Sequence, residues 1–437
     1  MSAAATIQRL GLRLISRAGS LPAMANPALR ARVGKALHRS AHAGGAAQLA
    51  VGRAFAAKRA ATSDPSRNDP TSPRGVFDLT PTEDQQLLRD AARVLADEVI
   101  RPAGAQADAD RAVPTEVTAA AAEMGLVLLG VPTELDGIAE DPSAVAGALV
   151  LEELARGDMG ITVGIMATAS VATAFSLYGS ADQQATYLPH FTGKDPVKAA
   201  ALAIQEPQPL FDALSPRTVG LARPDGISLN GVKAVVPRAD SAELFIVSAM
   251  VDSAPRLVIV EANTPGVTIE DDPAMGIRAA HTGRLVLTDV VVPATNLLGS
   301  TQDHRDAVRR SRLAWAAAAC GTAQAVLDQV LPYTKERHAF GEPIAHRQAV
   351  AFLIADIAIE LEGLRLVTWQ AAARLDAGKD ASEQIAKARA LTAMHATQIG
   401  SHGVQLLGGH GFVKEFDNER WYRDLRGAGV LEGTLLI

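Results

Sequence analysis

The chain has 437 residues, of which 48% are hydrophobic, 21% charged and only 4% aromatic. At about 150 residues per domain this predicts roughly three globular domains and excludes a disordered or fibrous chain. The first 63 residues hold ten Lys and Arg and no acid, so the remainder carries a net charge of −16, which excludes nucleic acid as the main partner. A single cysteine, Cys320, excludes an internal disulfide and a cysteine-based zinc site.

Residues 1–60 are predicted to form a basic amphipathic arm. Arg9, Arg13 and Arg17 recur every four positions, while apolar side chains occupy another face of the same helix. Three interpretations stay open: an arm that contacts a membrane surface or a partner, a transit peptide, and a solvated arm without a targeting function. Residues 61–76 are rich in Ser, Pro and Asp and predict a linker.

Residues 77–197 predict an N-terminal helical domain. Thr80 is placed to cap a helix that starts at Pro81, with Glu83 at the capping-box position. Residues 159–181 lack charged side chains and are long enough to span a membrane. Because they include six Ser or Thr and three Gly residues, a buried helix that lines a pocket is the favoured interpretation.

Residues 198–299 predict a central domain of antiparallel strands, a β-barrel or a sandwich, of which we expect the barrel. The turn signals Pro224-Asp225-Gly226 and Asn230-Gly231 interrupt this region. The apolar, β-rich runs cover residues 199–205, 243–251, 256–262, 267–271 and 284–292.

Residues 300–437 predict a C-terminal helical bundle. One apolar stripe over residues 348–377 predicts a single long helix, and long helices joined by short turns form bundles. The predicted fold class is therefore α+β multidomain, with helices, then strands, then a bundle that we expect to hold four helices.

Two glycine-containing segments are candidates for binding a phosphate-bearing ligand. Arg337-His338-Ala339-Phe340-Gly341 is followed by Gln348; the glycine permits a tight turn, and the arginine offers a planar fork to a phosphate. Gln405 begins a second segment in which Gly408, Gly409 and Gly411 allow close approach of a ligand. A salt-bridged turn and a helix C-cap are the alternatives.

A third segment, Glu432-Gly433-Thr434, lies between apolar neighbours. A carboxylate in apolar surroundings has a raised pKa and can act as a base near neutrality. Three histidines, His395, His402 and His410, come nearest to a cluster, but their spacing is not that of metal ligands, so no metal site is expected.

The patterns RxxFGxxxxxxQ, QxxGGxGF and EGT, in this order after a helix–strand–helix body, resemble the acyl-CoA dehydrogenase family over roughly residues 77–434. The resemblance implies FAD between barrel and bundle and a homotetramer or homodimer in which FAD reaches the neighbouring subunit. It also implies α,β-dehydrogenation of an acyl-CoA to the trans-2-enoyl-CoA, as in fatty-acid β-oxidation. An electron-transferring flavoprotein is the implied electron acceptor.

The resemblance also implies roles for individual residues. Glu432 matches the base that removes the α-proton, and in the family the N–H of this base helps to polarise the thioester oxygen. Arg312 and Gly433 are expected on the substrate side, Arg312 near the CoA end. Arg337, Phe340 and Gln348 are expected to contact the pyrophosphate and adenosine of FAD across the subunit boundary. The other residues expected to contact FAD are Gln405, Gly409, Thr434 and, by replacing a family threonine, Gln205.

The flavin-ring side of the barrel departs from the family pattern. Gln205 and Phe211 stand where the family has threonine and serine, and Val235 and Pro237 replace a tryptophan and a hydroxyl residue. Valine cannot stack on a ring, and proline has no N–H to donate. The alternative function is therefore a non-catalytic, FAD-poor member that serves as a partner subunit or an acyl-CoA-binding scaffold.

The sequence offers one observation on the acyl chain length and one expectation for the location of the protein. Gly160, Gly164, Ala167 and Ala169 would leave room for a longer acyl chain if their helix lines the pocket. In a bacterium, the expected location is the cytoplasm, with the basic arm as a candidate for peripheral membrane contact. In a eukaryote, the expected location is the mitochondrial matrix.

Overall fold

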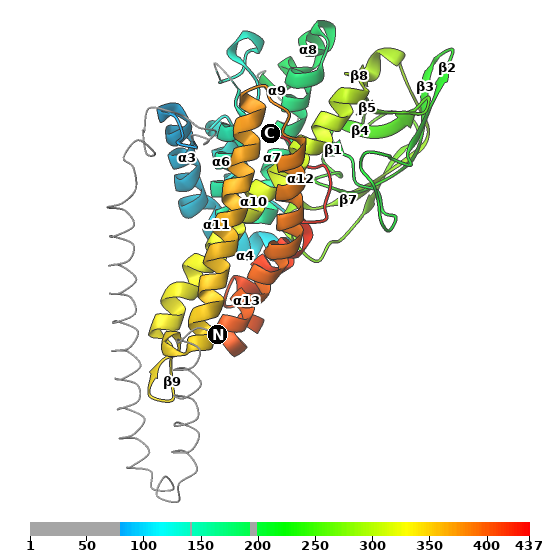
Figure 1. The fold of residues 1–437 in the computed structure, drawn as a ribbon. Helices are drawn as coiled ribbons and strands as arrows, with labels where there is room; N and C mark the ends of the chain where they lie inside the picture. The colour runs from blue at the N-terminus through cyan, green and yellow to red at the C-terminus, as the bar shows by residue number, and fades with distance from the viewer. Residues whose placement is uncertain (1–78, 140–141, 193–198) are drawn as a thin grey trace, which may run out of the picture. The chain divides into compact units, whose positions relative to one another are not determined.

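The computed structural model describes residues 79–139, 142–192 and 199–437. The predicted basic arm and linker lie outside these residues. The predicted order of helices, strands and helices is confirmed (Figure 1). The helices of the first part are α3 (Glu83–Leu95), α4 (Arg101–Asp110), α5 (Thr115–Glu123), α6 (Ala144–Gly157), α7 (Met159–Tyr178), α8 (Ala181–Tyr187) and α9 (Pro189–Thr192).

Helix α3 begins two residues later than predicted, so the assignment of Thr80 as its cap is wrong. The hydroxyl of Thr82 accepts the N–H of Gln85 at 3.2 Å, and the Gln85 side chain accepts the N–H of Thr82 at 3.0 Å. This reciprocal pair of bonds satisfies two main-chain N–H groups at once. Thr82 therefore caps the helix, although Thr80 stands on the other side of the same proline.

Helix α7 is a core helix. It is the one helix among the described residues that is long and apolar enough to cross a membrane, but 89% of its apolar window is buried inside the protein. The carboxylate of Asp158 caps α7 by accepting the N–H of Ile161 at 2.9 Å. An added Cβ at Gly164 would lie 2.5 Å from Val113, so this glycine permits close packing and leaves no space for an acyl chain.

The strands form one sheet in the order β6-β7-β3-β2-β4-β5-β8, with β1 paired to β4. Most pairs are antiparallel, as predicted, but β4 runs parallel to both β1 and β2. The strands are β1 (Ala200–Ala203), β2 (Val219–Arg223), β3 (Gly226–Val236), β4 (Leu244–Val251), β5 (Ala254–Glu261), β6 (Val267–Asp271), β7 (Gly283–Val292) and β8 (Leu297–Leu298).

The apolar, β-rich runs in the sequence did not predict strands β2 and β3. Pro224 and Asp225 form the turn between them, as their turn signal predicts. The second signal, Asn230-Gly231, is not a turn: it lies inside β3, where the pairing with β7 shifts register. Gly231 has φ +156°, and an added Cβ would lie 2.6 Å from Thr218, so glycine serves a β-bulge here.

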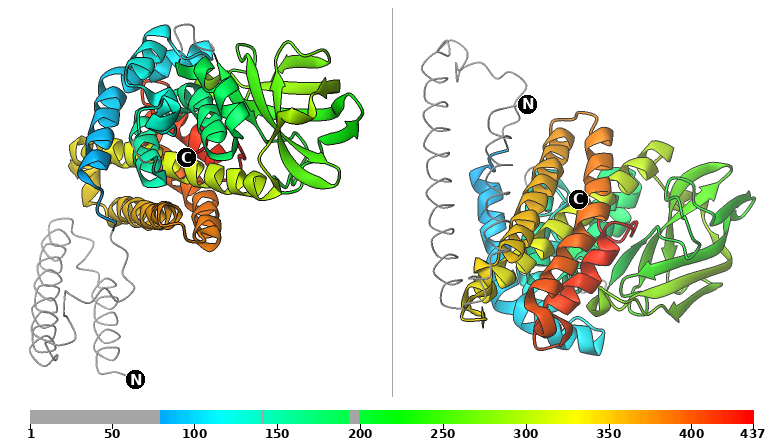
Figure 2. Two further views of the ribbon diagram at one scale, coloured as in Figure 1. Left: turned by 90° about the horizontal axis from the view of Figure 1, so that it is seen from above. Right: turned by 60° about the horizontal axis from the view of Figure 1, so that its bottom comes forward.

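The C-terminal part is helical and contains the predicted long helix, as α11. Helix α10 packs against α6, α11, α12, α13 and α14, and its Trp315 is fully buried. Figure 2 shows these helices together beside the sheet. The helices are α10 (Thr301–Glu336), α11 (Gln348–Asp376), α12 (Ser382–Leu391), α13 (Thr397–Leu407) and α14 (Asn418–Ala428); the hairpin of β9 (His338–Ala339) and β10 (Glu342–Pro343) joins α10 to α11.

Candidate active site

The Glu432-Gly433-Thr434 segment forms a turn that is anchored on α10. The carbonyl oxygen of Gly433 accepts hydrogen bonds from the Trp315 indole at 2.8 Å and from the Ser311 hydroxyl at 2.9 Å. Gly433 has φ +76°, and an added Cβ would lie 2.7 Å from the Cβ of Ile204. Glycine is therefore required here for both conformation and space.

Gly433→Ala is expected to destabilise the protein by about 1–3 kcal/mol, because alanine would adopt a left-handed conformation against Ile204. Urea unfolding at neutral pH measures the change. Gly363→Ala is the matched control, since an added Cβ there meets nothing within 4 Å on α11. Equal effects of the two substitutions would contradict the requirement for glycine at position 433.

The carboxylate of Glu432 is buried, with the residue 6% exposed, and two arginines hold it. Arg312 of α10 donates to Oε2 at 3.0 Å and to Oε1 at 2.9 Å, and Arg389 of α12 donates to Oε1 at 3.2 Å. The expectation of apolar surroundings is therefore wrong, because two helices distant in sequence bring guanidinium groups to this side chain. Paired charges of this kind orient a carboxylate strongly.

Arg389 is the site residue that the sequence motifs missed. Besides Glu432, it donates to the carbonyl oxygens of Ala428 at 3.3 Å and Leu431 at 2.7 Å, so it ties α12 to the segment that carries Glu432. Burial lowers the pKa of Arg389, although the attraction of Glu432 opposes this. The only sequence signal is that Arg389 is the last charged residue before 24 residues, 390–413, that hold no Asp, Glu, Lys or Arg.

The central strand domain contributes Gln205 through a contact that the sequence did not predict. Its side-chain oxygen accepts the N–H of Glu432 at 2.9 Å, and its amide nitrogen donates to the carbonyl of Glu206 at 3.3 Å. Of the other predicted ring-side positions, Phe211 is half-buried against a hydrophobic cluster, and the N–H of Val235 donates to Asp272 at 3.0 Å. These groups are occupied by contacts within the protein.

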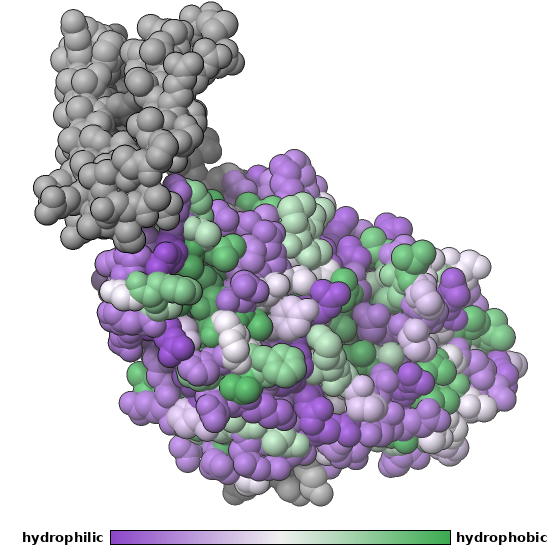
Figure 3. All heavy atoms as spheres, turned by 90° about the horizontal axis from the view of Figure 1, so that it is seen from below, coloured by the Kyte–Doolittle hydropathy of each residue, from purple (hydrophilic) through white to green (hydrophobic). Residues whose placement is uncertain are grey.

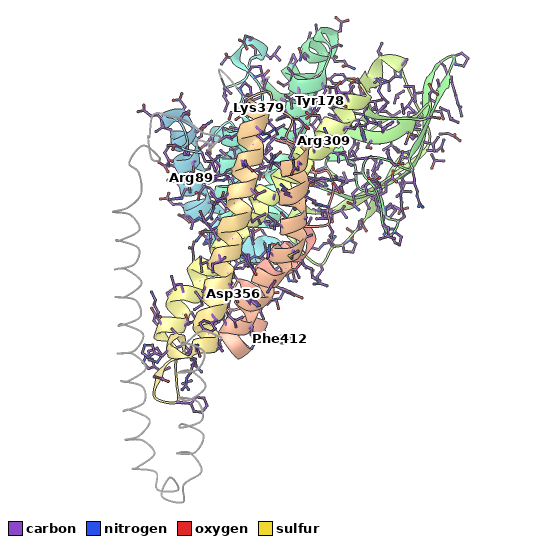
Figure 4. The ribbon with its side chains drawn as sticks, viewed as in Figure 1. Arg89, Tyr178, Arg309, Asp356, Lys379 and Phe412 are labelled. Atoms are coloured by element: carbon purple, nitrogen blue, oxygen red, sulfur yellow. The ribbon has the colours of Figure 1, made fainter. Side chains whose placement is uncertain are left out.

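Four of the predicted FAD contacts meet in one pocket of about 640 Å³ at the end of the bundle. Arg337, Phe340, Gln405 and Gly409 line it. Gln348, the first residue of α11, is not among the lining residues, but its neighbours on both sides are. Figure 4 labels Phe412 at the same end of the molecule as the β9 hairpin.

The motifs did not predict the aromatic side of this pocket. The Tyr333 hydroxyl lies 2.9 Å from Nδ1 of His410, and the His410 ring stacks on Phe416 with centroids 5.1 Å apart. Arg347 also lines the pocket and lies over the ring of Phe340, 5.5 Å from its centroid.

The pocket fits the adenosine and pyrophosphate half of FAD. Arg337 and Arg347 offer cationic forks for phosphates, and nothing lies within 4 Å of a Cβ built on Gly408 or Gly409, so a ligand can approach the main chain. The remaining candidate, Thr434, is buried, and its hydroxyl donates to the carbonyl of Gly433. Among the described residues, no group of three or more His, Cys, Asp or Glu could hold a metal ion.

Family models match the chain in three consecutive parts. The N-terminal, middle and C-terminal domains of acyl-CoA dehydrogenase match residues 82–195, 201–290 and 304–437. Among curated proteins, the chain is 33% identical over 364 residues to the mitochondrial short-chain specific acyl-CoA dehydrogenase of Rattus norvegicus, covering 80% of this chain and 87% of that protein.

Solved structures give the same result. The chain is 28% identical to butyryl-CoA dehydrogenase from Megasphaera elsdenii, with a TM-score of 0.74 over 81% of this chain and 95% of that chain. The same values hold for a chain in a structure titled as the electron transferring flavoprotein of Acidaminococcus fermentans. This chain therefore belongs to the acyl-CoA dehydrogenase family, a family of flavin-dependent oxidoreductases whose cofactor is FAD.

Proposed function

We propose that this protein oxidises an acyl-CoA thioester to the trans-2-enoyl-CoA, as in fatty-acid β-oxidation. The observation that carries the proposal is the buried Glu432 carboxylate, which Arg312 and Arg389 hold from two helices. A base must be fixed within hydrogen-bond reach of the proton that it removes, and this clamp restricts the carboxylate to one orientation.

The reaction divides between the protein and its cofactor. Glu432 takes the α-proton, and the C–H electron pair left behind becomes the new α,β double bond as hydride leaves the β-carbon. FAD, when bound, supplies the acceptor for that hydride. Arg312 and Arg389 keep the carboxylate aligned, and the pocket with Arg337 and Gln405 would hold the adenosine half of the cofactor. We propose an electron-transferring flavoprotein as the subsequent electron acceptor.

A small cavity between α7 and the last residues of the chain, Leu436 and Ile437, supports a short acyl chain. Met166, Ala169 and Thr173 of α7 line a cavity of about 40 Å³, which Leu436 and Ile437 border on the other side. At about 10–15 Å³ per water, this cavity holds about three waters. Leu436 is itself held there, because its N–H donates to the Ser170 hydroxyl at 2.9 Å. The small cavity supports a chain of few carbons.

Anaerobic addition of acyl-CoA to the flavin-loaded protein tests this function. We expect butyryl-CoA to bleach the flavin absorbance band and to do so about tenfold faster than palmitoyl-CoA at equal concentrations, because a small cavity excludes additional methylenes. A flavin-loaded protein that no acyl-CoA bleaches would contradict the reaction. Faster bleaching by palmitoyl-CoA would contradict the short-chain assignment alone.

We also propose that the protein forms a homotetramer or homodimer. Phe340 lines the pocket and is 96% exposed, and Phe412, which Figure 4 labels at the same end of the bundle, is 86% exposed. Phe352 and Ile359 on α11 are exposed as well. Figure 3 shows apolar side chains among polar ones on one face of the molecule. Exposed apolar groups gain from being covered by a second copy; a monomeric mass in light scattering would contradict this.

A non-catalytic acyl-CoA-binding scaffold or partner subunit is the second candidate. The observation that favours it is the ring side of the barrel, where Gln205 is engaged with Glu432 and neither Val235 nor Pro237 offers a stacking surface. Purified protein that lacks a flavin band and takes up no added FAD, yet binds acyl-CoA, would support this candidate against the enzyme.

A further inference from the structure

Gln205 connects the central strand domain to Glu432 by a hydrogen bond. It follows β1, and its main-chain carbonyl accepts the N–H of Ala234 at 2.9 Å, which holds its backbone on the sheet. From there the side chain reaches Glu432, 227 residues later in the chain. Because a main-chain N–H can only donate, the Gln205 amide must present its oxygen to Glu432.

The N–H of Glu432 is a main-chain donor on the same residue as the proposed base. A thioester whose α-carbon faces the carboxylate has its carbonyl oxygen two bonds from that carbon, on the same side as this N–H. Removal of the α-proton places negative charge on that oxygen, and a positioned N–H stabilises such charge. In this structure the N–H already has an acceptor, the amide oxygen of Gln205.

We infer that Gln205 competes with the thioester oxygen of the substrate for the N–H of Glu432, and that it thereby sets the affinity for acyl-CoA. The inference rests on the proposed function. An amide oxygen and a thioester oxygen are both carbonyl acceptors, so only one of them can take this donor with good geometry. Substrate binding therefore requires the Gln205 side chain to move away, and Gln205 makes no bond in the reaction.

Gln205→Met tests the competition, because methionine has nearly the same length but carries no amide oxygen. Gln208→Met is the matched control: Gln208 lies on the same loop, and its amide donates to Glu206, with no bond to Glu432. Both variants are compared with the wild type by titration with butyryl-CoA. Gln205→Met is expected to bind butyryl-CoA about fivefold more tightly, the factor that corresponds to about 1 kcal/mol for one hydrogen bond.

Infrared difference spectra of butyryl-CoA with an isotopically labelled carbonyl give a second readout that a purely structural role would not move. The stretching frequency of the bound carbonyl is expected to be lower in Gln205→Met than in the wild type, because the thioester then has the N–H to itself. Unchanged affinity and frequency in Gln205→Met, or equal changes in Gln208→Met, would overturn the inference.

The outcomes separate this inference from the proposed reaction. If wild-type protein bleaches with butyryl-CoA but Gln205→Met binds as the wild type does, only the role of Gln205 fails. If no acyl-CoA bleaches the flavin-loaded wild type, the reaction fails, whatever the binding data show.

Discussion

Glu432→Gln is expected to reduce the rate of anaerobic bleaching by acyl-CoA by about 10²–10⁴-fold while the flavin remains bound. Glutamine has the size of glutamate and can still accept a hydrogen bond from Arg312 or Arg389, but its amide does not take up the α-proton. The residues proposed to hold the adenosine half of FAD lie in a separate pocket, so the amount of bound flavin should not change.

Stopped-flow absorbance with butyryl-CoA measures this loss, and thermal unfolding checks that the variant is folded. Glu362→Gln is a suitable control, because Glu362 also pairs with an arginine, Arg365 at 2.8 Å, but is largely exposed and far from the turn in sequence. We expect the control to bleach at the wild-type rate. Full-rate bleaching by Glu432→Gln would show that another group is the base.

Lys233→Met is expected to destabilise the protein by about 3–5 kcal/mol, the usual cost of removing one partner of a buried ion pair. The Lys233 ammonium lies 2.7 Å from Oε1 of Glu206, and neither side chain is more than 1% exposed. Without Lys233, the carboxylate would keep its bonds from Thr218 and Arg217 but lose its counter-charge. Urea unfolding measures the loss.

Lys387→Met provides the contrast, since Lys387 pairs with Glu383 on the exposed side of α12. Its effect should stay within about 0.5 kcal/mol. The double variant Lys233→Met with Glu206→Gln should recover part of the lost stability, because it leaves no unpaired buried charge. Equal losses for Lys233→Met and Lys387→Met would show that the buried pair contributes no more than an exposed one.

The same pair predicts how stability depends on pH. Burial alone would raise the pKa of Glu206, but the Lys233 ammonium and the bonds from Lys233 and Thr218 outweigh it and lower this pKa from 4.5 to about 2. The unfolded chain therefore binds more protons between these values, and the stability from Glu206 is lost as pH falls from about 4.5 toward about 2. Glu206→Gln should flatten this part of the curve.

Burial of Lys233 affects the pH dependence of stability at alkaline pH. It lowers the pKa of Lys233 from 10.5 to about 8, against the attraction of Glu206. The unfolded chain binds the extra proton between those values, so this group alone makes stability rise with pH there.

Local patterns predicted much of the fold. The apolar stripe over residues 348–377 matches α11, because a period near 3.6 appears wherever one helix face is buried. Strands β2 and β3 were not predicted because exposed residues and glycines interrupt their apolar runs. In addition, the bulge at Gly231 has the same local composition as a turn. Thr82 and Thr80 are equally good caps until the helix itself is present.

The family, the order of helices and strands, and the candidates for the base and the adenosine pocket could be predicted from the amino-acid sequence, because each of these depends on residues that are close along the chain. The environment of Glu432 could not be predicted in this way and became visible only in the folded protein. Arg312, Arg389 and Gln205 reach it across separations of 120, 43 and 227 residues. Such contacts result from the packing of α10, α12 and the sheet against one another, and no local spacing in the chain encodes them.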